Sequence, residues 1–266
     1  ARGRPPSPPT VALMVDSAEH VDAAEAAARD AGSRVPLLID VDMSWRPLGL
    51  LHLGVRRSPL WRAAEVLALA ERIHGSPHLR FAGVMGYEAH IAGLQDRNPF
   101  APAMNGPKRL LKAMSRGPVR ALRAEIAAGL AARAIPCPIF NGGGTGSIDW
   151  SSDEAALTEV TAGSGFLDAH LFDYFVGLSL QPAAMFALQA ARRPADEYVT
   201  CHGGGWVASG EAGPDKLPIP YLPPGLSLLP LEGAGEVQTP LRVPPGLDVP
   251  LGAPVFFRHA KAGELA

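Results

Sequence analysis

Short apolar runs alternate with alanine-rich stretches along the first two thirds of the chain. The apolar runs predict buried strands at residues 11–15, 35–42, 79–85, 138–140 and 157–160. The stretches between them have helical spacing and predict helices at residues 18–31, 58–74 and 119–133. Continuously apolar strands that alternate with helices are typical of a parallel sheet covered on both faces. The sequence therefore predicts an α/β fold.

Polar residues follow these strands at their carboxyl ends, where a β/α barrel places its active site. They are Asp16, Asp40, Asp42, Tyr87, His90, Asn141 and Ser164. About five strands are recognisable, a barrel has eight, and the deficit falls before residue 10. We therefore expect a partial (β/α)8 TIM-type barrel over residues 1–177, with its early strands missing.

The pattern changes after about residue 178. Short strands are predicted at residues 185–191, 197–201 and 204–209, separated by proline and glycine. Residues 214–254 contain many prolines and only short apolar pieces. We expect a small C-terminal β-domain over residues 178–266.

Composition narrows the function classes. Charged residues make up 19% of the 266 residues and the net charge is −2, so the chain has no basic excess and nucleic acid is not an expected partner. No apolar run approaches the roughly 20 residues that span a bilayer, so no membrane association is expected. The first ten residues include four prolines and lack the apolar core of a secretory signal. Two cysteines suit a reducing cytoplasm.

Residues 141–147 read Asn-Gly-Gly-Gly-Thr-Gly-Ser and follow an apolar run directly. Glycines allow several N–H groups to converge on an anion, and the hydroxyls of Thr145 and Ser147 can add donors. The alternative is a sharp turn that binds nothing, which is the usual caution for an isolated glycine-rich loop. Gly163, Ser164 and Gly165 supply a second small-residue turn one strand later. Two such turns after consecutive strands favour a phosphate site.

Tyr87 and His90 lie in a loop at a strand end. Tyr87 can stack on a flat ring and His90 can carry a proton, or Tyr87 can pack and His90 can be solvated. Alternation along a strand puts Asp40 and Asp42 on one side, where both can orient a base or an arginine. Helix capping or a surface position is the alternative for these two carboxylates.

Three further positions carry charge or metal-binding potential. Arg56 and Arg57 form either a solvated pair or a site for a substrate carboxylate. His259 and Lys261 share one face of a strand end, an arrangement familiar from metal sites. However, a protonated lysine has no lone pair to donate, and its cation more naturally replaces a metal than binds one.

Taken together, these residues resemble the D-threonine aldolase / D-serine dehydratase family, which comprises pyridoxal-phosphate (PLP) enzymes built on the alanine-racemase barrel. The residues of the matching segments are most similar to a bacterial branch described as amino acid deaminase/aldolase. The matching segments are residues 37–42 with Arg46, 83–90, 141–147, 162–164, 199–205, 235–238 and 255–265.

The resemblance implies the cofactor, the roles of several residues and an assembly. PLP would be the cofactor and a small D-amino acid the substrate, and the intact protein would be a homodimer. The PLP site would include Asn141, Gly143, Gly144, Thr145, Gly163 and Ser164, most of them around the phosphate. Tyr87 and His90 would line the ring and the substrate, and His259 would occupy the catalytic metal position for zinc or manganese.

The chain departs from the family pattern in three places. Lys261 stands where the family has the second metal ligand, and Gly165 stands where many members have a tyrosine. The family binds PLP covalently through a lysine on an early barrel strand. The lysines of this chain are Lys108, Lys112, Lys216 and Lys261. Because none falls on an early strand, we expect an N-terminally truncated member that is inactive as it stands.

The sequence therefore predicts a PLP-dependent lyase for D-amino acids with a β-hydroxyl group. Its reaction would be D-threonine aldol cleavage or D-serine dehydration and deamination. A non-catalytic barrel protein that binds PLP or a phosphometabolite is the first alternative. A phosphate-binding barrel enzyme that does not use PLP is the second.

Overall fold

A computed structural model describes residues 11–264. The proline-rich opening of the chain and Leu265 lie outside the described residues. The chain forms two compact units, the first made of the residues up to Leu94 together with Leu110–Thr161. The second consists of Gln95–Arg109 and the residues from Ala162 onward. The boundary expected after residue 177 falls within this second unit.

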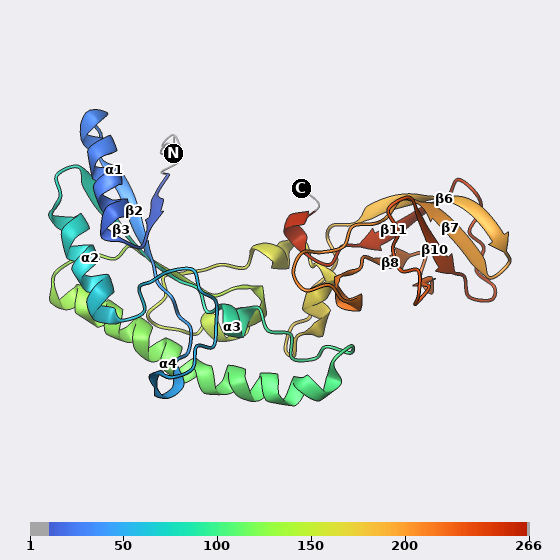
Figure 1. Ribbon diagram of the computed structural model, residues 1–266, viewed down its shortest axis with the longest axis horizontal. Helices are drawn as coiled ribbons and strands as arrows, with labels where there is room; N and C mark the ends of the chain where they lie inside the picture. Colours follow the sequence, from blue (N-terminus) through green and yellow to red (C-terminus); the bar gives the residue numbers. More distant parts are fainter. Residues whose placement is uncertain (1–10, 265–266) are drawn as a thin grey trace, which may run out of the picture. The chain divides into compact units, whose positions relative to one another are not determined.

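A parallel sheet forms the centre of the first unit (Figure 1). Its five strands pair in sequence order, so each neighbouring pair is joined by a crossover connection. They are β1 (Leu13–Val15), β2 (Val35–Asp40), β3 (Leu79–Gly86), β4 (Ile139–Gly142) and β5 (Glu159–Val160). Consecutive parallel strands with intervening helices form part of a β/α barrel wall, which confirms the predicted fold class.

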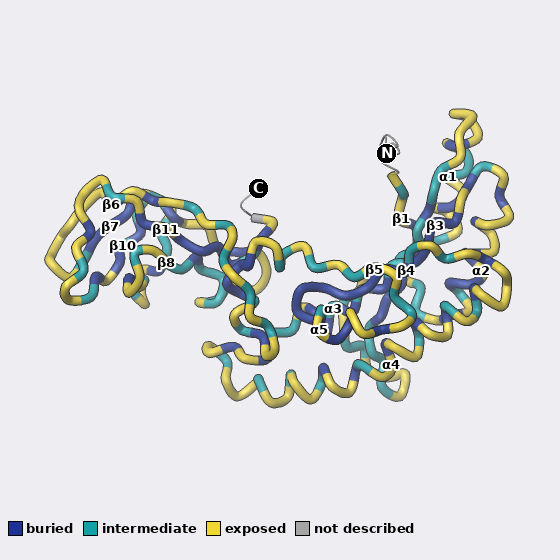
Figure 2. The backbone as a smooth tube through the Cα atoms, turned by 180° about the vertical axis from the view of Figure 1, so that it is seen from behind, coloured by how far each residue is buried: buried dark blue, intermediate teal, exposed yellow. Residues whose placement is uncertain are grey.

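Three long helices cover the sheet, namely α1 (Ala18–Asp30), α2 (Ala63–Gly75) and α4 (Asn105–Ala132). The hydroxyl of Ser17 caps α1 by accepting the N–H of His20 at 3.2 Å. One core forms where the helices meet the strands (Figure 2), and it includes Val21, Ile73 and Ile126. The short helices α3 (Ala89–Ala92) and α5 (Ile148–Ser151) lie after β3 and β4.

Two predicted helix starts are wrong. We expected a helix from Val119, but α4 begins at Asn105 and contains Pro118. Lys112 and Val119 are both buried, so one inward-facing stripe continues across the proline, and packing outweighs its local cost. Lys108 and Lys112 therefore lie on this helix.

Helix α2 begins at Ala63 rather than at Ser58. The Ser58 hydroxyl donates instead to the carbonyl oxygen of Asp40 at 2.8 Å. The carboxylate of Glu65 accepts the N–H groups of Trp61 and Arg62, both at 3.2 Å, and this capping interaction sets the start of the helix.

The second unit contains an antiparallel sheet in the strand order β8-β11-β6-β7-β10-β9. The strands are β6 (Phe186–Ala195), β7 (Tyr198–His202), β8 (Ile219–Leu222), β9 (Ser227–Leu228), β10 (Gln238–Arg242) and β11 (Pro254–Arg258). β8 and β9, the two ends of this order, are in contact, so the sheet nearly closes around a core of its own. The expected C-terminal β-domain is confirmed.

The strand expected at residues 204–209 is wrong. Gly203 and Gly204 have φ values of +77° and +120°, which no regular strand contains. The N–H of Trp206 turns back to the carbonyl oxygen of Gly204 at 2.8 Å. The glycines therefore end the ordered strand at β7 instead of starting another.

Among the described residues, no helix has the length and apolar character to cross a bilayer.

A bulge in β3 depends on one glycine. Leu37 and Leu38 of β2 pair with Phe81 and Gly83, so Ala82 is an extra residue. Gly83 has a φ of +149°, and a Cβ built there would lie 1.8 Å from the carbonyl oxygen of Ile139. The bulge therefore brings β3 and β4 too close together for any side chain.

We expect Gly83→Ala to lower the free energy of unfolding by at least about 2 kcal/mol, through the clash and the strained φ. Urea titration followed by circular dichroism measures this loss. Gly75→Ala is the matched control, because a Cβ there meets nothing within 4 Å and its φ is ordinary. Equal stability of the two variants would contradict the bulge.

Candidate functional site

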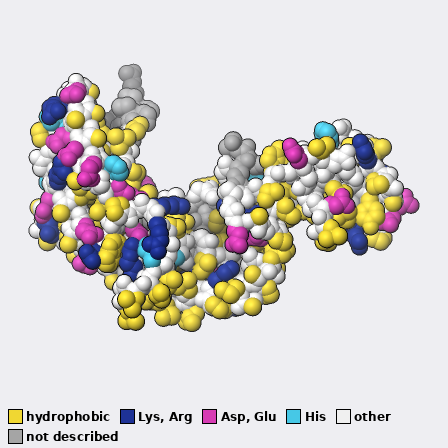
Figure 3. Space-filling view, viewed as in Figure 1, with side chains coloured by type: hydrophobic (Ala, Val, Ile, Leu, Met, Phe, Trp, Pro, Cys, Tyr) yellow, Lys and Arg dark blue, Asp and Glu magenta, His cyan; other side chains and the backbone are white. Residues whose placement is uncertain are grey.

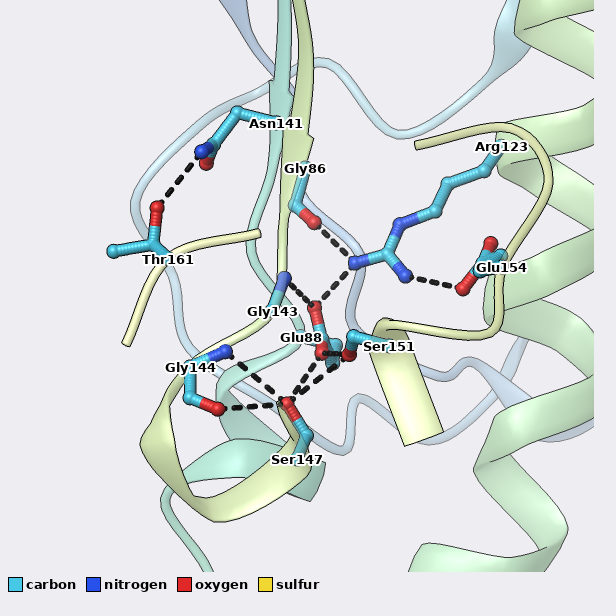
Figure 4. A network of polar contacts seen from close by, with 10 residues as sticks. All are labelled: Gly86, Glu88, Arg123, Asn141, Gly143, Gly144, Ser147, Ser151, Glu154 and Thr161. Atoms are coloured by element: carbon cyan, nitrogen blue, oxygen red, sulfur yellow. Dashed lines mark hydrogen bonds and ion pairs between the residues drawn. The ribbon is translucent and has the colours of Figure 1, made fainter. Parts of the chain in front are cut away.

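A buried carboxylate organises the loops at the carboxyl ends of β3 and β4. Glu88 follows β3, and its side chain is 0% exposed. Its Oε1 accepts the hydroxyls of Ser147 and Ser151, each at 2.7 Å. Its Oε2 accepts the N–H of Gly143 at 3.0 Å and a donor from Arg123. We call these residues and Glu154 the Glu88 network (Figure 4).

Arg123 lies on α4 and is also 0% exposed. Its guanidinium donates to Glu88, to the carbonyl oxygen of Gly86 at 2.6 Å and to Glu154 at 2.7 Å. A buried ion pair is stabilising only when hydrogen bonds compensate its desolvation. Here both terminal nitrogens of Arg123 are bonded, whereas its Nε and the Oε1 of Glu154 are buried without a partner among the described residues. The pair connects the end of β3 to the helix that precedes β4.

The pKa of Glu88 is below its usual value. Burial alone would raise it, but the positive charge of Arg123 and the hydroxyls of Ser147 and Ser151 outweigh burial. Glu88 is therefore ionised at neutral pH. Its role is to hold backbone and hydroxyl donors in place rather than to exchange protons.

This network changes the interpretation of the glycine-rich turn. The N–H of Gly143 is bound by Glu88, and the N–H of Gly144 is bound by the hydroxyl of Ser147 at 3.1 Å. Ser147 in turn donates to Glu88. Three of the donors expected for a phosphate are therefore used inside the protein, and the expectation that Ser147 offers its hydroxyl to a ligand is wrong.

Packing explains two of the glycines. A Cβ on Gly143 would lie 2.7 Å from Val160, and one on Gly144 would lie 2.9 Å from both Ala92 and the ring of Tyr87. Thr145 begins the 3-10 turn Thr145–Ser147, and its side chain is largely buried. The turn is therefore tightly packed and lies against the ring of Tyr87.

Tyr87 and His90 lie at the carboxyl edge of the parallel sheet. Both ring nitrogens of His90 are buried and have no hydrogen-bond partner among the described residues. Burial lowers the pKa of His90, although the nearby carboxylates of Glu88 and Asp42 oppose this effect. Burial, followed by the charge of Glu88, raises the pKa of Tyr87. At neutral pH the histidine is neutral and the tyrosine keeps its proton.

The two aspartates at the end of β2 differ. Asp42 is buried and accepts Arg46 at 2.6 Å and the N–H of Ser44 at 2.8 Å, so it orients an arginine as the sequence suggested. Asp40 is the last residue of β2, and its pKa is raised by burial and by the charge of Asp16.

Asn141 donates to Glu159 and Thr161, both at 2.7 Å, and so connects β4 to β5 and the residue that follows it.

The remaining predicted residues belong to the second unit. Gly163 and Ser164 start the 3-10 turn Gly163–Phe166, and a Cβ on Gly163 would meet nothing within 4 Å. His259 is buried after β11, and its carbonyl oxygen accepts the N–H of His170 at 3.0 Å. Lys261 donates to the carbonyl and hydroxyl oxygens of Ser209. The described residues contain no group of three potential metal-ligating side chains.

Sequence reasoning missed Glu88, Arg123, Ser151 and Glu154. Glu88 lies between two residues that were singled out, but nothing in its local pattern distinguishes it from a surface carboxylate. Arg123 lies on an alanine-rich helix where a charged residue normally faces water. The local sequence gives only a weak signal for this cluster, because its charged and hydroxyl-bearing residues come from separate segments that only the fold brings together.

Comparison with known proteins identifies the family. Residues 8–167 match the model for the alanine racemase N-terminal domain. The chain belongs to that family. It is 26% identical over 250 residues to the D-threonine aldolase of Arthrobacter sp, covering 91% of this chain and 58% of that relative.

Two solved structures share the fold. The D-threonine aldolase from Filomicrobium marinum superposes with a TM-score of 0.73 at 16% identity, over 95% of this chain and 61% of that one. The D-threo-3-hydroxyaspartate dehydratase from Delftia sp. HT23 superposes with a TM-score of 0.62 at 20% identity, over 93% and 65%. The chain thus spans about three fifths of the length of these relatives. The resemblance found in the sequence is confirmed.

We expect Glu88→Gln to lower the free energy of unfolding by about 3 kcal/mol at pH 7, because it removes one of the two carboxylates that pair with the buried Arg123 and leaves Glu154 as the other. Glu71→Gln is the matched control. Glu71 pairs with Arg133, and both side chains are at least 40% exposed, so its loss costs about 1 kcal/mol at most. Urea unfolding measures both variants.

The difference between wild type and Glu88→Gln also depends on pH. Because the folded protein lowers the pKa of Glu88, its stabilisation is complete above the unfolded pKa of about 4.3 and is lost as the pH falls through the lower folded value. The two unfolding free energies should therefore converge below about pH 4. A constant difference from pH 7 to pH 3 would contradict this assignment.

Proposed function

We propose that the protein containing this chain is a PLP-dependent lyase that acts on D-amino acids with a β-hydroxyl group. The observation that carries the proposal is His90, a buried and neutral histidine whose two ring nitrogens lack partners among the described residues. It lies at the sheet edge where barrel enzymes bind substrate, in a chain related to a D-threonine aldolase.

The residues of the first unit fit the ring side of a PLP site. A buried histidine without hydrogen-bond partners costs free energy unless a ligand group completes it. Tyr87 lies directly against the turn at Gly144 and presents a flat ring there. When bound, PLP would supply the electron sink that makes bonds at the substrate Cα labile.

The proton-handling residues follow from their pKa shifts. His90 is neutral, so one of its ring nitrogens can accept a proton from the substrate hydroxyl or from Cα. Tyr87 retains its proton and can donate a hydrogen bond. Which proton His90 removes would decide between aldol cleavage and dehydration.

For the phosphate we propose Thr145 as a direct contact within the first unit; Gly163 and Ser164 belong to the second unit, and their role stays a prediction from the sequence. Gly143 and Gly144 would act by shape, since their N–H groups are already bound within the Glu88 network. If His259 holds zinc or manganese, the ion would need ligands other than Lys261.

A non-covalent PLP or phosphometabolite binder is the second candidate. One observation favours it: none of the five described strands of the parallel sheet carries a lysine. Lys108 and Lys112 lie on α4, Lys216 in a 3-10 turn and Lys261 after β11. A covalent attachment on an early barrel strand, as the family resemblance implies, would therefore require a lysine outside the 266 residues.

We further propose a cytoplasmic homodimer. The thiols of Cys137 and Cys201 are both free, which fits a reducing compartment. Size-exclusion chromatography with light scattering on the whole protein tests the dimer.

We expect the whole protein, with any residues that precede this chain, to convert D-threonine to glycine and acetaldehyde or D-serine to pyruvate when loaded with PLP. His90→Gln should lower the turnover by about 10²- to 10⁴-fold, the usual contribution of an acid-base group. His74→Gln, on the exposed end of α2, is the control and should leave turnover unchanged. A folded, PLP-loaded protein that acts on neither substrate would refute the proposal.

Borohydride reduction separates the two candidates. A covalent imine leaves the cofactor attached after denaturation, whereas a non-covalent binder releases it. We expect attachment in the whole protein and none in the 266-residue chain. Attachment in the 266-residue chain would show that one of its own lysines carries the cofactor.

A further inference from the structure

The loop between β2 and α2 contains a cationic pocket that the proposed chemistry does not use. The pocket has a volume of about 560 Å³, and its polar lining includes Asp42, Arg46, His52, Arg56, Arg57 and Ser58. Figure 3 shows basic side chains with a histidine gathered over the first unit on the face seen there.

The pocket has an excess of positive charge. Asp42 neutralises Arg46 through the 2.6 Å ion pair described above. Within the described part of the chain, neither Arg56 nor Arg57 has a carboxylate within ion-pair distance. Neither guanidinium is therefore held in an ion pair, although the charge of Arg57 also acts on the carboxyl group of Asp40. A guanidinium group can bind a carboxylate in bidentate fashion, through two parallel N–H hydrogen bonds.

The loop is held by specific contacts. Trp45 and Leu53 exchange two backbone hydrogen bonds of 2.9 Å, and the Ser44 hydroxyl donates to the carbonyl oxygen of Val55 at 3.0 Å. Gly54 has a φ of +152°, and a Cβ there would lie 2.1 Å from the Ser44 hydroxyl. Nε2 of His52 lies 3.0 Å from the carbonyl oxygen of Val55. A loop fixed in this way presents its cations with little ordering cost on binding.

The pocket adjoins the candidate active site. The Arg57 guanidinium carbon lies 5.9 Å from the centre of the Tyr87 ring. Ser58 is hydrogen-bonded to the end of β2 at Asp40. A ligand whose reacting carbon is near His90 can thus extend an anionic end toward Arg57.

We propose that Arg56 and Arg57 bind the side-chain carboxylate of the substrate, which makes the preferred substrate class 3-hydroxy dicarboxylic D-amino acids. This inference rests on the proposed lyase function. Two guanidiniums without an ion-pair partner can together hold the two oxygens of one carboxylate through charge-assisted hydrogen bonds. The methyl group of D-threonine would leave both arginines without a counter-ion.

The first test uses the 266-residue chain and isothermal titration calorimetry, which needs no activity. The probes are D-malate, a four-carbon hydroxydicarboxylate, D-lactate, its monocarboxylate counterpart, and inorganic phosphate. We expect D-malate to bind at least about tenfold more tightly than D-lactate or phosphate. Arg56→Gln and Arg57→Gln should each weaken D-malate binding by about tenfold.

Arg62→Gln is the matched control. This exposed arginine lies just beyond the loop, pairs with Glu65 at 3.4 Å and should leave binding unchanged. Thermal unfolding of each variant verifies that it is folded. Equal binding of D-malate by the arginine variants would overturn the inference. Phosphate binding as tight as D-malate binding, and lost in the same variants, would overturn it in favour of a phosphate site.

The second test separates this inference from the proposed function. In the whole PLP-loaded protein, the ratio of kcat/KM for D-threo-3-hydroxyaspartate to that for D-serine should fall about tenfold in Arg57→Gln. Activity on D-serine with an unchanged ratio would overturn the carboxylate site and leave the lyase function standing. D-malate binding that requires both arginines, in a protein inactive on every substrate, would support the site and refute the lyase.

Discussion

The ion pair between Glu88 and Arg123 is the interaction on which the rest of the first unit depends. It joins the loop after β3 to α4, the helix that precedes β4. Both side chains are removed from water, so Glu88 cannot lose Arg123 without remaining as an unpaired buried charge, and Arg123 without Glu88 keeps only Glu154. The other contacts of the Glu88 network surround this ion pair and hydrogen-bond to its two side chains. The glycine-rich turn, α3 and α5 take their positions from it.

This arrangement separates two roles that glycine-rich turns often combine. Phosphate-binding turns point free N–H groups at a ligand. Here the N–H groups of Gly143 and Gly144 are bound within the protein, and the glycines allow Val160 and Tyr87 to pack closely. The turn contributes to a ligand site by shaping its wall and placing Tyr87. Donors for an anion must come from elsewhere.

The sequence predicted the sheet well because buried parallel strands are continuous apolar runs, and β2 and β3 are clear examples. It also located Tyr87, His90 and the turn near Gly143, since polar residues at strand ends of an α/β fold meet at one edge. It failed for the first half of α4, because Gly117 and Pro118 outweigh periodicity in local reasoning. It also failed for Glu88, whose partners Ser147 and Arg123 are 59 and 35 residues away and whose burial no local pattern records.

The bulge at Ala82 has a consequence for how this chain can vary. Side chains alternate along a strand, so one extra residue changes the side to which every later residue points. The single inserted position in β3 therefore decides whether Val84 or Met85 faces the core, and with it the direction in which the chain enters the loop at Glu88. Related sequences can gain or lose residues in this strand only in pairs, or by moving the bulge. The number of residues between the start of β3 and the loop at Glu88 must therefore stay odd or stay even, although the individual side chains of the strand are free to change.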